Sequence, residues 1–224
     1  MLRATAHGVY EVRIDGVPVS EAVLAPGWSS YPHRLAVEEV DITLMIRDGA
    51  LVEVLVGNGW WRGGLGFVKM GIDYGSEVGF AAEILIQYAD TTSANVATSM
   101  DWRAHTSAVG QNSIYDGEVI DATLAGRWLE VVEIPFDSSV LVPQVKPPIV
   151  RHEALRPVSI SSSSTGSPVI DFGQNLVGWV RLRARGEPGT RVTVRHAEVL
   201  EGRTRDATAA RGEGHRYVRA HRWG

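Results

Sequence analysis

The chain has 224 residues, of which 44% are hydrophobic and 21% are charged, with a formal net charge of −4 and no cysteine. This composition is ordinary for a globular protein, and so mild a charge gives no reason to expect nucleic acid or an anionic membrane as a partner. The absence of cysteine excludes disulfides and thiolate metal sites.

The start of the chain has neither the apolar core nor the cleavage site of a secretory signal. No stretch approaches the roughly 20 apolar residues that a membrane span needs. We therefore expect a soluble chain without signal peptide or membrane span. The compartment is not fixed by the sequence, so a cytoplasmic location is only the default expectation.

The first part of the chain is predicted to be a series of short strands joined by Gly, Asp and Pro turns. Residues 9–14 alternate and meet Asp15-Gly16 before a second apolar run, which is the strongest short hairpin signal. Residues 39–50 begin as a strand and hold at most one helical turn, with Thr43 as its candidate N-cap. Further strands are expected at residues 51–56, 80–90, 115–120 and 127–134. No apolar stripe of helical period appears, so the sequence predicts an all-β fold of sandwich type.

A domain boundary is predicted where residues 137–157 hold four prolines and little alternation. We place a first β-sandwich at residues 1–140 and an extended, Pro-rich linker at 141–157. A second β unit then covers residues 158–201, beginning with a polar loop at 159–168.

Within the second unit, residues 179–185 and 191–195 are predicted to pair as a hairpin, because apolar residues alternate with polar ones, mostly arginine, in both. The basic face is interpreted as solvated or in contact with another domain. The alternative, a grip on an anionic polysaccharide, is weakened by neighbouring acidic residues.

The last stretch, residues 202–224, carries six arginines and two acids, about +4 in total, and shows no period. We expect a disordered tail there. The fold class is thus all-β, with two jelly-roll-like β-sandwich units of which the second is incomplete.

Three stretches of the chain, in this order, resemble the N-terminal region of bacterial α-L-rhamnosidases. The first is "GVYEVRIDGVPVSEAVLAPGWSSYPHR" and the second is "VGNGWWRGGLGF". The third runs from "PPIVRHEALRPVSI" to "VIDFGQNLVGWVRLRARGEPGTRVTVRHAEVLE", and "IYDGEVIDA" fits between the second and third. The resemblance covers about residues 5–201. The run "DFGQNLVGW" followed by "RHAEVL" is its most specific part.

The resemblance implies a part of a longer, multidomain, inverting glycoside hydrolase. Such enzymes have N-terminal β-sandwich modules, one of them carbohydrate-binding, then a concanavalin-like sandwich and a catalytic (α/α)6 barrel. The chain is expected to hold the carbohydrate-binding-type module and the start of the concanavalin-like domain. The expected partners are rhamnose-containing glycans and the catalytic barrel. The Arg-rich stretch departs from the family pattern, which suggests a truncated or frame-shifted gene copy.

Catalysis by this chain alone is not expected. Inverting hydrolysis needs two carboxyl groups about 6.5–9.5 Å apart. The candidates, Asp116, Glu118 and Asp121, are interpreted as turn and edge residues. The serine run at 161–164 lacks the strand–elbow–helix context of a nucleophile, so no catalytic residue is predicted.

A calcium-dependent sugar site is implied by the resemblance, since related modules bind L-rhamnose through a calcium ion. The matching positions here offer Asn58 in the turn 57–60 and Asp101 next to the loop 102–109. Calcium takes six to eight oxygens, usually including carboxylates, and Arg103 would oppose it. Asn58 and Asp101 are therefore the candidate calcium and sugar ligands of a site that is degraded or differently built.

Trp60 and Trp61 complete the candidate sugar site. Adjacent residues of a strand face opposite sides, so at most one indole can stack on a sugar while the other anchors the turn. The alternative is that both are structural. Trp28, Trp102, Trp128 and Trp179 are interpreted as packing residues.

Two functions follow from these observations. The first is a non-catalytic fragment of an α-L-rhamnosidase-like enzyme that binds or positions rhamnose-containing glycans. The second is a β-sandwich scaffold that docks on a separate catalytic domain without binding sugar. A hydrolase complete within this chain is the weakest alternative.

Overall fold

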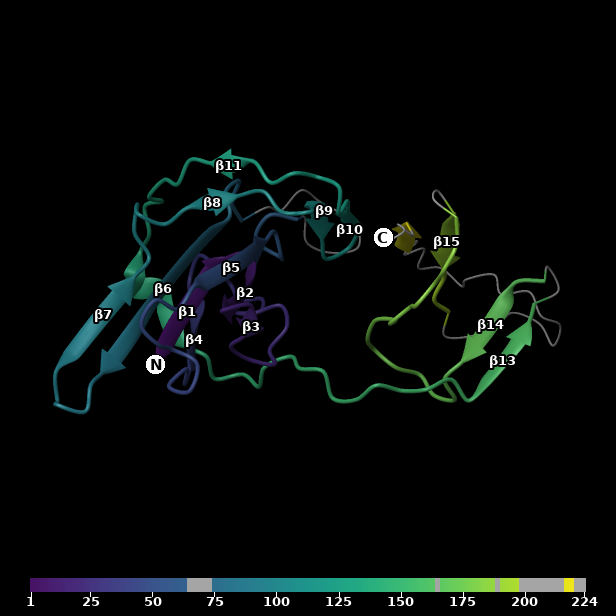
Figure 1. Cartoon of the computed structure of the whole chain (residues 1–224), viewed down its shortest axis with the longest axis horizontal. Coiled ribbons are helices and arrows are strands. Elements are labelled where there is room, and N and C mark those ends of the chain that lie inside the picture. Colours follow the sequence, from purple (N-terminus) through teal and green to yellow (C-terminus); the bar gives the residue numbers. More distant parts are fainter. Residues whose placement is uncertain (64–73, 164–165, 188–189, 198–215, 220–224) are drawn as a thin grey trace. The chain divides into compact units, whose positions relative to one another are not determined.

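The computed structural model describes residues 1–63, 74–163, 166–187 and 190–197, and the backbone of residues 216–219. The chain divides into two compact units, Met1–Arg151 and His152–Gly224, whose strands are labelled in Figure 1. Across the described residues there are strands and turns but no α-helix, and only Ser138–Val140 form a 3₁₀ turn. The all-β prediction is therefore confirmed. No helix in this part of the chain is long and apolar enough to cross a membrane.

Two sheets form the body of the first unit (Figure 1). The larger has the order β12-β4-β1-β6-β7, from β1 (Leu2–His7), β4 (Leu35–Val40), β6 (Gly79–Gln87), β7 (Ser93–Ala97) and β12 (Leu141–Pro143). The smaller has the order β3-β2-β5, from β2 (Val9–Ile14), β3 (Val17–Pro18) and β5 (Val52–Gly57). Two short pairs complete the unit: β8 (Ala104–His105) with β11 (Trp128–Leu129), and β9 (Val109–Ser113) with β10 (Gly117–Ile120).

The core of the first unit lies between β1 and β2, which belong to different sheets. Alternate residues of each strand are buried, as expected when one face of each sheet packs inward. The buried apolar residues of the two strands form one cluster together with Ile42 and Ile84. Those of β1 and β2 are Leu2, Ala4, Ala6, Tyr10, Val12 and Ile14. This shared core is the packing of a β-sandwich.

The hairpin predicted at Asp15-Gly16 is confirmed. Ile14 pairs with Val17, and both turn residues have positive φ, 49° for Asp15 and 78° for Gly16. This is the backbone of a type I′ turn, whose twist matches that of the strands it joins.

The N-cap prediction at residues 39–50 needs a correction. A turn forms there, with the Met45 and Ile46 amides donating to the Ile42 carbonyl oxygen. Its capping acceptor is the Asp41 carboxylate, which accepts from the Thr43 amide at 2.9 Å. Asp41 takes this role because its carboxylate already reaches the amide two residues ahead, as in an Asx turn.

The segment predicted as a linker begins inside the first unit. Leu141–Pro143 form β12, which pairs in parallel with β4 at the edge of the larger sheet. The Val23 amide then donates to the Ile149 carbonyl oxygen at 2.8 Å, and Val150 bridges Ala22. An edge strand tolerates proline. Residues 141–150 are therefore a strap on the first unit, and the division between the units falls at Arg151/His152.

The second unit differs from the predicted pairings in two places. Ser159–Ser162, predicted as loop, form β13 and pair with β14 (Pro168–Asp171). The strand β15 (Arg191–Val194) pairs with the backbone of β16 (Arg216–Arg219), and no strand forms within residues 179–185. Alternation predicts a strand but does not name its partner. Apart from the backbone of β16, the predicted tail lies outside the described residues.

The second unit buries little of its apolar surface. None of its described residues, 152–163, 166–187 and 190–197, is buried. Ile160 is 70% exposed and Val177 is fully exposed. The described residues of this unit form two strand pairs, β13–β14 and β15–β16, without a buried core between facing sheets.

Candidate functional site

The turn that follows β5 carries the two adjacent tryptophans. The Arg62 amide donates to the Asn58 carbonyl oxygen at 3.2 Å and closes the turn. Gly59 has a φ of +54°, and a Cβ there would lie 2.6 Å from the Val9 side chain. Glycine is therefore required at this position both for the backbone conformation and for the approach to β2.

Trp61 is the tryptophan that anchors the turn. Its indole stacks on the His7 ring with centroids 3.8 Å apart, and the Tyr31 ring meets it edge-on at 5.2 Å. Its Nε1 donates to the Glu77 carbonyl oxygen at 2.7 Å. Gly75 permits this packing, since a Cβ there would lie 2.3 Å from the indole. Trp61 is thus engaged in the fold by its ring contacts and by its indole N–H.

The anchoring cluster keeps its titratable groups uncharged. Burial lowers the pKa of His7 below its ordinary value. Burial, with a smaller contribution from Tyr74, raises the pKa of Tyr31 to about 12. The Tyr31 hydroxyl is buried and has no hydrogen-bond partner among the described residues. These groups stabilise the turn by packing rather than by charge.

Trp60, in contrast, lines a pocket of about 290 Å³ in the first unit. Ligand pockets begin at roughly 300 Å³, so the space suits a small ligand such as one or two sugar rings. Trp28, which is 44% exposed, lines the same pocket. The remaining wall comes from the loop at residues 22–27, from Glu38, and from the strap residues Gln144, Lys146, Pro147, Pro148 and Ile149.

The polar groups of the pocket are few and fixed in place. Gln144 Nε2 donates to the Pro26 carbonyl oxygen at 3.0 Å, and Lys146 Nζ donates to the Trp28 carbonyl oxygen at 3.4 Å. Two indoles with a small number of polar groups are the composition of a site for a neutral, partly apolar ligand.

The predicted calcium ligands lie in two different turns. The Asn58 amide donates to Asn112 Oδ1 at 2.7 Å, and Asn58 Nδ2 donates to the Asn112 carbonyl oxygen at 2.8 Å. Asp101 lies in a different turn, where its amide donates to Ser99 Oγ at 3.2 Å. Among the described residues, no hydrogen bond joins Asn58 to Asp101 and no three acidic or His side chains gather. Asn58 and Asp101 thus offer two side chains from separate turns, whereas calcium takes six to eight oxygens in all.

Two of the three carboxylates considered for hydrolysis serve turns, and the third, Glu118, lies on β10 opposite Asn112. Asp121 Oδ1 accepts from the amide and the hydroxyl of Thr123, at 2.9 and 2.6 Å. Asp116 Oδ2 accepts from the Ser113 hydroxyl at 3.3 Å, at the β9–β10 turn. These short-range contacts are the turn chemistry expected of Asp.

Sequence reasoning missed most of the pocket. Trp28 was interpreted as a packing residue, and Gln144 and Lys146 fell in the predicted linker. The signal available was the dipeptide Pro26-Gly27 before Trp28, which places an indole on an exposed turn. No pattern in the sequence near Trp28 indicates that a segment 118 residues further along the chain lies against this loop.

Family models match both units of the chain. The α-L-rhamnosidase N-terminal domain matches residues 1–153, and the bacterial α-L-rhamnosidase concanavalin-like domain matches residues 161–223. The chain belongs to the α-L-rhamnosidase family. The second match extends through the Arg-rich stretch to residue 223.

Relatives and solved structures agree with this assignment. An α-L-rhamnosidase of Streptomyces avermitilis is 35% identical over 89% of this chain, and one of an Alteromonas species is 31% identical over 89%. A solved α-L-rhamnosidase of Aspergillus terreus covers 97% of the chain with a TM-score of 0.82 and 30% identity. The Streptomyces avermitilis enzyme, solved in complex with L-rhamnose, covers 97% with a TM-score of 0.78 and 32% identity.

The chain spans a minor share of these rhamnosidases. It covers 20% and 23% of the two curated relatives and 28% and 23% of the two solved chains. It corresponds to their N-terminal, non-catalytic part.

Proposed function

We propose that this chain is a sugar-binding and scaffold part of an α-L-rhamnosidase, which holds a rhamnose-containing glycan in the pocket lined by Trp28 and Trp60. The observation that carries the proposal is that the two tryptophans of the turn after β5 have different surroundings. Trp61 is engaged in the fold by its stacking on His7, while Trp60 lines the pocket. An indole beside a pocket of this size offers a flat apolar face to the C–H groups of a sugar ring.

Rhamnose is the sugar to test first. A Streptomyces avermitilis α-L-rhamnosidase has been solved in complex with L-rhamnose, and the similarity covers 97% of the present chain and 23% of that enzyme. The rhamnosidase activity would reside in the catalytic barrel of such an enzyme, and this chain would bring the glycan toward it.

The experiment is a calorimetric titration of the 224-residue chain with L-rhamnose, and with L-fucose as a control sugar. Saturable heat with L-rhamnose alone supports the proposal. Absence of heat with either sugar contradicts it and favours the second candidate function, a scaffold that docks on a separate catalytic domain. The exposed apolar residues of the second unit, such as Ile160 and Val177, are the observation that supports docking.

A calcium ion that helps to bind the sugar is the expectation with the weakest support from the described side chains. We expect the affinity for L-rhamnose to change less than twofold when calcium is replaced by a chelator, because Asn58 and Asp101 lie in separate turns and no three His, Asp or Glu side chains gather among the described residues. The same titration in calcium and in EDTA measures this. A tenfold loss in EDTA would restore Asn58 and Asp101 as calcium ligands.

A further inference from the structure

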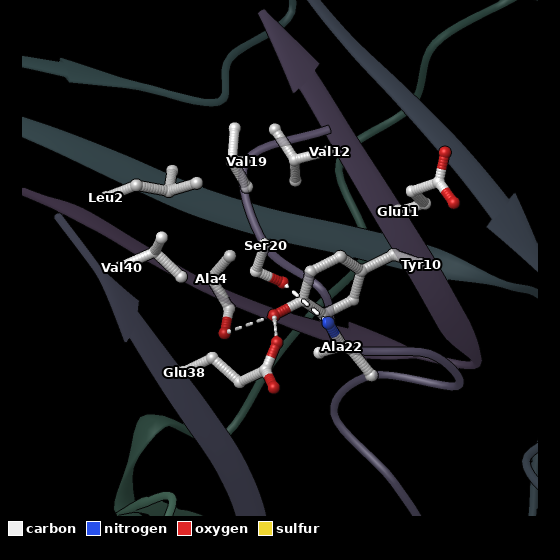
Figure 2. Close-up of a pocket in the computed structure, with 11 residues that line it drawn as sticks. Leu2, Ala4, Tyr10, Glu11, Val12, Val19, Ser20, Ala22, Glu38 and Val40 are labelled. Atoms are coloured by element: carbon white, nitrogen blue, oxygen red, sulfur yellow. Dashed lines mark hydrogen bonds between the residues drawn. The ribbon is translucent and has the colours of Figure 1, made fainter. Parts of the chain in front are cut away.

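Glu38 is the acidic residue of the pocket, and it is held by a buried tyrosine. It lies on β4 and lines both the pocket of about 290 Å³ and an adjoining cavity of about 10 Å³. The Tyr10 hydroxyl donates to Glu38 Oε2 at 2.7 Å (Figure 2). Burial, and then the Glu38 charge, raise the pKa of Tyr10 far above its ordinary value, so the phenol stays a donor.

The fold does not require a carboxylate at this position. The Tyr10 hydroxyl lies 3.2 Å from the Ala4 carbonyl oxygen, which is an acceptor already present in the core. Glu38 is half-buried, and no ion pair within 4.0 Å joins it to Lys146 or to any other described cation. A polar side chain in a pocket wall that the fold does not use in an ion pair is a candidate for ligand recognition.

One carboxylate oxygen of Glu38 is free for a ligand. The Tyr10 hydroxyl contacts Oε2, and among the described residues Oε1 has no hydrogen-bond partner. Figure 2 shows this second oxygen turned away from the Tyr10 hydroxyl. A carboxylate fixed at one oxygen and open at the other is a preorganised acceptor for a hydroxyl group.

We propose that Glu38 is a specificity-determining residue of the pocket, which accepts a hydrogen bond from a ring hydroxyl of the bound sugar, and that Tyr10 positions its carboxylate. The inference rests on the proposed sugar-binding function. It adds that recognition goes beyond stacking on Trp60 and selects sugars with a hydroxyl at one ring position. A neutral polyhydroxylated sugar fits this arrangement, whereas an anionic group would be repelled by the carboxylate.

The test compares Glu38→Gln with the matched control Glu39→Gln. Glu39 is the next residue on β4, is 55% exposed, and pairs with Arg3 outside the pocket. We expect Glu38→Gln to weaken L-rhamnose binding about tenfold, because a charge-assisted hydrogen bond is roughly twice as strong as a neutral one. Glu39→Gln is expected to bind as the parent chain does. Tyr10→Phe is expected to weaken binding about threefold, because it removes the hydrogen bond that positions Glu38 Oε2 but leaves the carboxylate in place.

Deoxy analogues separate recognition from a merely structural role. Methyl α-L-rhamnoside and its 2-, 3- and 4-deoxy derivatives are titrated into the parent chain and Glu38→Gln. We expect one derivative to bind the parent chain about tenfold more weakly and to bind Glu38→Gln with no further loss. Equal losses for that derivative in both proteins, or an unchanged affinity of Glu38→Gln, overturn the inference and leave the proposed function standing. Lack of binding by the parent chain overturns both.

Discussion

Replacing Trp61 by alanine is expected to lower the free energy of unfolding of the first unit by about 3 kcal/mol, near the lower end for removing a packed tryptophan. The substitution removes the stack on His7, the edge contact with Tyr31 and the hydrogen bond to the Glu77 carbonyl oxygen. The lower end applies because Trp61 is half-buried rather than fully enclosed. Urea unfolding followed by far-UV circular dichroism measures the change.

The matched control is Trp128→Ala. Trp128 is 67% exposed, and its one ring contact among the described residues is with His105 at 5.5 Å, so its removal is expected to change stability by about 0.5 kcal/mol or less. An equal effect of the two substitutions would contradict the assignment of Trp61 as the anchor.

Replacing Trp60 by alanine is expected to have the opposite pattern, with binding lost and stability kept. Truncating a tryptophan at the centre of a binding site costs about 2 kcal/mol or more, which corresponds to roughly thirtyfold in affinity. Trp60 borders the pocket, and no aromatic partner in the described part of the chain holds its ring. Calorimetry with L-rhamnose on Trp60→Ala, with Trp128→Ala as the control, measures the loss. Equal affinity in the two variants would show that the sugar does not touch this indole.

The parts of the fold that could be predicted are those with a local physical cause. Asp15-Gly16 needs positive φ at two successive residues, and the turn forms where this pair occurs. The alternation in residues 9–14 places Tyr10, Val12 and Ile14 on one face, and all three are buried. The absence of helical period likewise predicted the strands.

The parts that could not be predicted depend on pairings between distant segments. Alternation favoured a hairpin of residues 179–185 with 191–195, yet β15 pairs with β16. The prolines at 143, 147 and 148 favoured a free linker, yet this strap hydrogen-bonds to the loop that carries Trp28. Strand propensity is a property of one segment, whereas the strand with which that segment pairs depends on the packing of the whole sandwich.

The candidate site was predicted in part for the same reason. Adjacency alone implied that Trp60 and Trp61 take different roles, but which indole packs inward depends on His7 and Tyr31. Glu38 carried no signal in the sequence, because its position beside a pocket follows from the β12–β4 pairing and the strap beyond it.

An NMR titration of the indole N–H groups of the seven tryptophans with L-rhamnose tests the central claim most directly. Single Trp→Phe variants assign the signals of Trp28, Trp60 and Trp128. We predict saturable shifts of the Trp28 and Trp60 signals with a common affinity, while the Trp128 signal stays in place. Saturable binding that leaves the Trp28 and Trp60 signals unmoved would contradict the placement of the sugar in this pocket.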